Sequence, residues 1–382
     1  MGPIFSATIA VGGQTINVKS LELSYSKTKK GDTFKATLAM MDPAATNIVD
    51  YVGQTVIATV NGTPAPGQFF LEQVDYSFDA TAIEVSGRDT VSTTLLDNGT
   101  ANPEWSNTFT NKTPKQVTQE LVMGFPLEMD QVGHLDGKIY HTDWNAILHR
   151  QSSWDAISDI ADFYGLNPFT TGGKVYLKLV TATWPQRNVT WQPPTDVSYA
   201  RGNFIRMKCS KNGPMAKQIK VQTNSWNHKK KKLFKGNATA GGSSDGVQNY
   251  KYAGSGHTQK QVDHMSQKKA NEHAKHALNI ELLFFGDMTW TPLFQVQVSG
   301  TGTVFDTIYD VEHVDHHIIC ETGQHHRGGH HIQSSTFESS QSSGGFTTTV
   351  VGKSAGGSGA GGSADSAGPT SSAGGSTSGG ST

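Results

Sequence analysis

The sequence has few charged residues and almost no cysteine. Charged residues make up 16% of the 382 positions, against ~25% in an average soluble chain. The 31 basic and 32 acidic side chains leave a formal net charge of -1. Without a basic excess, the chain lacks the electrostatic footprint of a dedicated nucleic-acid-binding protein. Low charge combined with 42 glycines favours a β-rich protein with many turns, or a surface that an assembly buries.

Disulfides, targeting signals and membrane spans are not expected either. Cys209 and Cys320 are too few for a disulfide framework or a four-thiolate zinc site, and Cys209 is expected to be a buried free thiol in a strand. The N-terminal sequence MGPIFSATIAVGG has no basic region before a long apolar core, so no signal peptide is expected. No run approaches the ~18 apolar residues of a membrane helix. These absences predict a soluble protein made in a cytoplasm, without stable membrane association.

Residues 1–100 have the pattern of a small β-barrel domain. Ser20–Met41 largely alternates between apolar and polar residues and is interrupted by the turn Lys29–Asp32, which predicts a hairpin. Short strands at regular spacing with turn residues between them are typical of a barrel or sandwich. Further strands are predicted at Val56–Val60, Gln68–Leu71 and Ala82–Asp89.

Residues 101–195 change to a helical period and predict an α+β insert. Thr113 and Pro114 begin one helix, because proline is tolerated in the first turn. Ser152 is a natural N-cap for a second helix that carries Trp154 and ends near Gly165. A turn at Gly172-Gly173 and a strand at Lys174–Leu179 follow.

Residues 196–340 predict a second β-barrel domain with an embedded helix at 259–283. The strand Lys217–Gln222 alternates, and a Gly/Ser/Asn-rich loop is expected at 236–249. The last strands are predicted at 294–298, 308–319 and 330–337. Residues 341–382, rich in Gly, Ser, Ala and Thr, predict a flexible tail because they offer too little apolar surface to offset the entropy of ordering. The fold class is therefore mostly β: two small barrels with an α+β insert.

Three motifs, in this order, resemble a known family. The first is Val85–Asp89 followed by Leu95-Leu96-Asp97, the second is Ser153–Ile157 with Gly165 and Gly172-Gly173, and the third is Tyr309–His316. On these motifs and on the domain order, residues 1–340 resemble the baseplate hub family of contractile phages. That family includes the hub proteins of phages Mu and T4 and the late control protein D group.

The resemblance implies a structural virion protein of the tail baseplate, made in the cytoplasm of a host bacterium and not an enzyme. It implies a homotrimer whose six barrels form a ring that joins the tail tube to the central spike. Baseplate wedge or tape-measure proteins would be further partners, and DNA would pass through the lumen during ejection. No cofactor is implied. A closed heterologous ring of this kind leaves no strand edges exposed.

Histidines offer an enzymatic alternative, a metal-dependent cell-wall hydrolase. Imidazole binds zinc, and a hairpin would bring His313 close to His330 or His331. However, no His-Glu-x-x-His motif is present, and neighbouring strand residues point to opposite faces. A solvated or lumen-facing cluster is the competing interpretation, and His316 is expected to be a packing residue. The clustered histidines are His313, His316, His317, His325, His326, His330 and His331.

A run of lysines follows Trp226 and His228. It offers a contact with DNA in the lumen or with an acidic partner, against the alternative of a solvated hairpin tip. Its members are Lys229, Lys230, Lys231, Lys232 and Lys235.

The remaining patterns predict no catalytic residue. Asp155, Asp159 and Asp162 are interpreted as a solvated helix face rather than as paired glycosidase carboxylates. Neither Gly254-Ser255-Gly256 nor Gly352-Lys353-Ser354 matches a nucleophile elbow or a phosphate-binding loop. A receptor- or glycan-binding module is a third alternative, for which Trp184 and Trp191 are the candidate contact residues.

Overall fold

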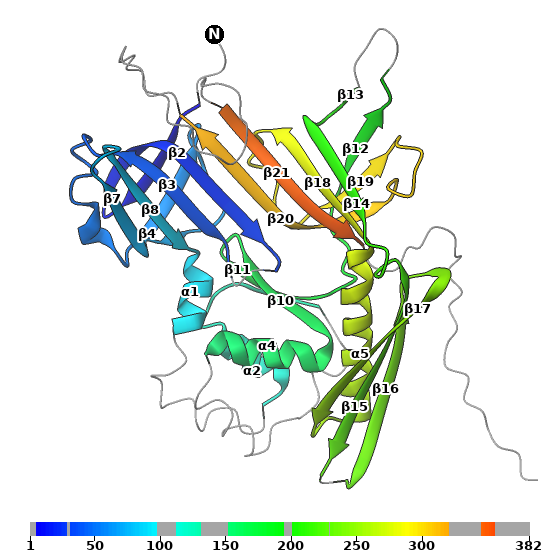
Figure 1. The fold of residues 1–382 in the computed structure, drawn as a ribbon. Helices are drawn as coiled ribbons and strands as arrows, with labels where there is room; N and C mark the ends of the chain where they lie inside the picture. Colours follow the sequence, from blue (N-terminus) through cyan, green and yellow to red (C-terminus); the bar gives the residue numbers. More distant parts are fainter. Residues whose placement is uncertain are drawn as a thin grey trace, which may run out of the picture.

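The computed structural model describes residues 5–28, 31–97, 112–130, 152–194, 201–228, 230–320 and 345–355. The chain is mostly β with a few helices, which confirms the predicted fold class. Two β-rich lobes lie side by side, and the insert and a projecting sheet lie beneath them (Figure 1). No helix within these ranges is both long enough and apolar enough to cross a membrane.

The first lobe is a sheet that curls back on itself. Its strands pair in the order β4-β1-β2-β3-β8, and β6 pairs with β4 while Phe69 bridges to Asp89 at the end of β8. The alternating strands predicted from the sequence are thus present in this lobe. The elements are β1 (Ala7–Val11), β2 (Gln14–Ser26), β3 (Thr33–Ala39), η1 (Ile48–Tyr51), β4 (Thr55–Val60), β5 (Thr63–Pro64), β6 (Phe69–Phe70), β7 (Gln73–Ser77), β8 (Ala82–Arg88) and α1 (Thr90–Asp97).

The second lobe has the strand order β12-β19-β20-β21-β18-β14. Cys209 in β14 and Cys320 just after β20 are free thiols, each only half-buried. The strands are β12 (Gln186–Gln192), β13 (Arg201–Gly202), β14 (Arg206–Lys211), β18 (Leu278–Phe285), β19 (Gln295–Ser299), β20 (Ile308–Ile319) and β21 (Gly345–Ser354).

The two lobes are joined by antiparallel pairing of β2 with β20. The ladder runs from Ser20 opposite Ile319 to Ser26 opposite His313. Each of these long strands uses its other half within its own lobe, β2 with β1 and β20 with β19. Buried side chains from both lobes therefore form one continuous core, which includes Leu23 and Val314.

The insert is a small α+β unit with its own core. Thr113 caps α2 (Pro114–Leu121) and Ser152 caps α4 (Ser153–Tyr164), both through capping boxes. The helix start at Thr113 and Pro114 and the N-cap at Ser152 were predicted from the sequence, whereas the capping boxes were not. The strands β9 (Leu127–Met129), β10 (Leu166–Thr171) and β11 (Lys174–Leu179) form its sheet. Trp154 and Ile157 of α4 pack into the core of this unit.

A three-stranded projecting sheet, ordered β16-β15-β17, stands apart from the lobes (Figure 1). It consists of β15 (Lys217–Asn227), β16 (Lys232–Ala240) and β17 (Ser243–Ser255). Helix α5 (Gln259–Ala274) covers one face and buries Ala270 against Ile219 and Val221.

The structure corrects two predicted elements in this region. The loop expected at 236–249 is largely strand, since its residues belong mostly to β16 and β17. Gly236 lets α5 approach β16 closely, because a Cβ there would lie 2.6 Å from the Val262 carbonyl oxygen. The helix expected at 259–283 ends at Ala274, and after the short 3-10 turn η4 (Lys275–Ala277) the chain becomes strand β18. Leu278–Phe285 alternates into the large core, and this tertiary burial determines its conformation.

The flexible tail predicted at 341–382 is also wrong at its start. Residues 345–354 form β21, which lies between β18 and β20 and buries Phe346 and Val350. Likewise the predicted insert, 101–195, includes β12, which pairs with β19 of the second lobe. The strand predicted at 330–337 lies outside the described residues.

We expect a chain that ends at residue 344 to lose most of its stability, because β18 and β20 would both lose their shared neighbour β21. A chain that ends at residue 355 retains every described element and is the matched control. Thermal unfolding followed by circular dichroism measures the difference. Equal melting temperatures for the two truncated chains would contradict the placement of β21.

Candidate functional site

The first sequence motif builds a buried junction at the end of the first lobe. A Cβ on Gly87 would lie 1.7 Å from the Phe70 carbonyl oxygen, so only glycine allows the two strands to approach. Arg88 pairs with Glu72 at 2.8 Å. The Asp89 carboxylate accepts hydrogen bonds from the Ser92 backbone amide at 2.7 Å, which holds the start of α1, and from the Asp32 backbone amide at 2.8 Å.

Asp32 carries the junction on to the insert. Its carboxylate accepts hydrogen bonds from the Gly172 amide at 2.9 Å and the Ser26 amide at 3.2 Å. The Thr170 hydroxyl donates to Asp89 at 3.3 Å. The glycine turn of the second motif is therefore held by Asp32, which is itself bound to Asp89 of the first motif. Sequence reasoning identified Asp89 within a motif but took Asp32 only as a turn residue.

The two carboxylates are buried, each 1% exposed. Burial raises the pKa of both groups, and the charge of Asp89 further raises the pKa of Asp32. Raised carboxyl pKa values are typical of acid catalysts, but a catalyst must reach its substrate. This pair is closed off by backbone amides and hydroxyls, so its geometry suits a structural connection between lobe and insert.

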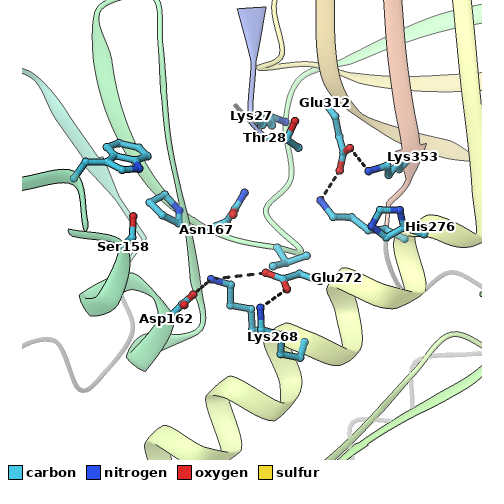
Figure 2. Close-up of a pocket in the computed structure, with 15 residues that line it drawn as sticks. Lys27, Thr28, Ser158, Asp162, Asn167, Lys268, Glu272, His276, Glu312 and Lys353 are labelled. Carbon is cyan, nitrogen blue, oxygen red and sulfur yellow. Dashed lines mark hydrogen bonds and ion pairs between the residues drawn. The ribbon is translucent and has the colours of Figure 1, made fainter. Parts of the chain in front are cut away.

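The third motif lines a cavity of about 500 Å³ where the insert, α5 and the second lobe meet (Figure 2). Asp310 pairs with Lys27 at 2.9 Å. The Glu312 carboxylate forms ion pairs with the Lys275 amine at 2.9 Å and with the Lys353 amine at 2.5 Å. Lysines that follow β2 and α5 and one from β21 thus converge on two carboxylates of β20, Asp310 and Glu312.

Lys268 closes the opposite wall of this cavity. Its side chain is 4% exposed, and its amine pairs with Asp162 of α4 and donates to the Leu166 carbonyl oxygen at 2.6 Å. Glu272, one helical turn further along α5, lies 3.7 Å from the same amine. Figure 2 shows Asp162, Lys268 and Glu272 on one side of the cavity and Glu312 with Lys353 on the other.

Burial shapes the charges around the cavity. It lowers the pKa of Lys27 to about 8 and raises the pKa of Asp310. Burial also acts to raise the pKa of Glu312, but Lys275 and Lys353 overcome it and lower that pKa. The lysines are engaged by protein carboxylates, so the cavity connects three parts of the fold rather than presenting a free nucleophile.

The structure separates the candidate metal ligands. His316 points inward and is buried, with Nδ1 3.0 Å from the Thr348 hydroxyl and Nε2 3.1 Å from the Trp290 carbonyl oxygen. Burial lowers its pKa to about 4. His313 lies on the other face of β20, with Nε2 2.8 Å from Asp315. Within the described ranges no three His, Cys, Asp or Glu side chains group as a metal site; the structure does not describe His325, His326, His330 and His331.

The lysine run does not form a single patch. Lys230 and Lys231 lie exposed in the turn between β15 and β16, and Lys229 lies outside the described residues. Lys232 places its amine 5.7 Å from the centre of the Phe234 ring, on the α5 side of the sheet. Lys235 projects from the opposite side.

The acidic residues of α4 have structural roles. Asp155 completes the capping box with Ser152, and Asp162 pairs with Lys268. The sequence Gly352-Lys353-Ser354 is part of β21 rather than a loop.

The candidate glycan contact Trp184 packs beneath Lys27, whose amine lies 4.4 Å from the ring centre. Phe169 and Tyr176 contact the same ring edge-on. Trp184 is thus part of the junction between insert and lobe rather than an open aromatic platform.

Comparisons with known proteins match the fold and not the sequence. No known family model matches, and no curated protein matches significantly. The tail protein from Neisseria meningitidis MC58 aligns with a TM-score of 0.64 and 12% identity, covering 92% of this chain and 97% of that chain. The 43 kDa tail protein of prophage MuSo2 from Shewanella oneidensis aligns at 0.61 and 12%, covering 92% and 98%. Prophage tail protein gp18 from Listeria monocytogenes EGD-e aligns at 0.54 and 9%, covering 91% and 94%.

The chain therefore has the fold of these phage-type tail proteins. The likeness spans both lobes, the insert and the projecting sheet, since it covers nine-tenths of the chain. It agrees with the fold that the three sequence motifs predicted.

We expect Gly87→Ala to destabilise the protein by about 3 kcal/mol, near the upper end for overpacking, because the new methyl group meets a backbone oxygen. Gly213→Ala is the matched control, since a Cβ there meets nothing within 4 Å. Urea denaturation of both variants measures the loss. A similar midpoint for the two variants would disprove the close approach at Gly87.

Lys268→Ala is expected to cost about 1–3 kcal/mol, because the buried Leu166 carbonyl oxygen loses its partner. Lys269→Ala removes the same charge from a more exposed position on the same helix and should stay within about 0.5 kcal/mol of the parent. Thermal unfolding compares the two. If Lys269→Ala costs as much as Lys268→Ala, the cavity contact is not what holds α5 to the insert.

Proposed function

We propose that this chain is a structural hub of a phage or phage-like contractile tail, acting without catalysis. The observation that carries the proposal is the likeness of fold over nearly the entire length of both this chain and two tail proteins. Its location would be the tail baseplate of the virion. The proposed partners are further copies of itself, the tail tube protein, the central spike protein and baseplate wedge or tape-measure proteins.

The geometry of the lobes supports a ring of three copies. Two barrel-like lobes are joined rigidly, because the β2–β20 ladder and a common core cross the boundary between them. Three such subunits would present six similar lobes around a closed ring, with heterologous contacts between neighbours. Such a ring has the symmetry needed between a sixfold tube and a threefold spike, and its lumen would let DNA pass during ejection.

Exposed apolar side chains on the first lobe fit a contact with a neighbouring copy. Met41 is 86% exposed and Phe78 is 75% exposed. The Met40 amide donates to the Thr81 carbonyl oxygen, so the end of β3 lies beside the β7–β8 turn that carries Phe78. Large exposed apolar residues at one end of a lobe mark an interaction surface.

The alternatives draw no support from the described residues. For a metal-dependent hydrolase, the predicted pairing joins His313 with His330 or His331, which lie outside the described residues; His316 lies on the opposite face of β20 from His313. For a glycan-binding module, Trp184 would have to be open, and it is packed beneath Lys27; Trp191, the second candidate, lies half-buried in β12.

The mass of the purified chain in solution, measured by light scattering across concentration with and without a chelator, tests the ring. We expect a mass near three times the 41.0 kDa of one chain, unchanged by the chelator. Phe78→Glu should shift the mass towards the monomer. Val304→Glu changes an exposed apolar residue of the second lobe and tests, by the same shift in mass, whether that lobe contacts a neighbouring copy. A monomer at every concentration, even when spike and tube proteins are added, would contradict the proposal.

A further inference from the structure

One face of the projecting sheet is left open by the described fold. Helix α5 packs on the side that carries Ile219, Val221 and Ala238. The opposite side, here called the outer face, carries the exposed side chains of Lys220, Lys235 and Lys251, and Trp226 is 44% exposed there. A three-stranded sheet whose second face is solvated is available to a partner.

The strand register distributes the lysines over this face. Lys220 pairs with Thr239 of β16 and Asn249 of β17. In the next row Lys251 lies opposite Gln222, and in the row after that Lys235 lies opposite Asn224. Successive rows are about 7 Å apart, since two residues separate them along each strand. Each row thus combines one positive charge with at least one carboxamide.

The charge on the outer face has a single sign. The three strands contain no Glu, and their only Asp is Asp245, whose side chain lies outside the described residues. The near-zero net charge of the whole chain therefore conceals a local basic surface. Lys230 and Lys231 extend it at the turn next to Trp226.

The fourth row supplies an aromatic surface. Trp226 pairs with Leu233 of β16, and both side chains are 44% exposed. A tryptophan near the end of the central strand of a basic, amide-rich sheet is suited to stack on a base whose phosphates are held by lysines. An acidic protein surface would use the lysines but would have no specific use for the indole.

We propose that the outer face binds nucleic acid, with Lys220, Lys235 and Lys251 on the phosphates and Trp226 stacked on an unpaired base. The contacts lie within one subunit. The proposal therefore does not depend on the ring, and either can fail without the other.

Fluorescence anisotropy of labelled 20-nucleotide single strands and 20-base-pair duplexes, titrated with the full chain at several salt concentrations, tests the proposal. Three phosphate contacts predict a slope of log affinity against log salt of about -2 to -3. The triple variant Lys220→Gln, Lys235→Gln, Lys251→Gln should weaken binding at least tenfold and remove most of that slope. Trp226→Ala should weaken single-strand binding more than duplex binding.

The matched control is Lys208→Gln, Lys211→Gln, Lys260→Gln, which removes the same charge from exposed positions on β14 and α5. It should retain the parent affinity. Light scattering on both triple variants should give the parent mass, which separates loss of binding from loss of assembly. The absence of parent binding at low salt, or equal loss in both triple variants, would overturn the proposal. Tighter binding of polyglutamate than of either nucleic acid, with the same lysine dependence, would overturn it in favour of an acidic protein partner.

Discussion

The rest of the structure depends on the pairing of β2 with β20. Each strand is long enough to serve its own lobe with one half and the neighbouring lobe with the other. A loop between the lobes would leave them free to rotate, whereas a ladder of backbone hydrogen bonds fixes both their distance and their twist. The buried side chains beneath the ladder, among them Tyr25 and His316 in edge-on contact, belong to both lobes at once.

Buried charge, together with apolar packing of Val91 and Leu95 of α1 in the core of the insert, connects the smaller parts to this body. The insert is held by Asp32 and Asp89, and the end of α5 is held by Glu312. Such contacts add little net stability, because desolvation offsets their attraction, but they tolerate no change of geometry. A protein whose parts must hold fixed relative positions has reason to keep such buried polar contacts. The raised pKa values of the two aspartates are the electrostatic cost of that arrangement.

Local signals in the sequence were sufficient for the insert and insufficient for the last strands. The helix start at Thr113, the N-cap at Ser152 and the turn at Gly172-Gly173 depend on signals within a few residues, and the structure has them where they were predicted. Strand β21 has a polar, threonine-rich sequence that pairs only because two distant strands present open edges. Local signals are insufficient for the candidate site for the same reason. Asp89 belongs to a motif, but its partner Asp32 and the lysines of the outer face become neighbours only through long-range pairing.

The position of β21 also sets the order in which the body can be completed. This strand lies between β18 and β20, so both keep an open edge until residue 354 has left the ribosome. The first lobe, the insert and the projecting sheet have all been synthesised by then, while the strand shared by the lobes still lacks a neighbour. The second lobe is therefore the last of these parts to be completed, although its first strand, β12, is made before the projecting sheet.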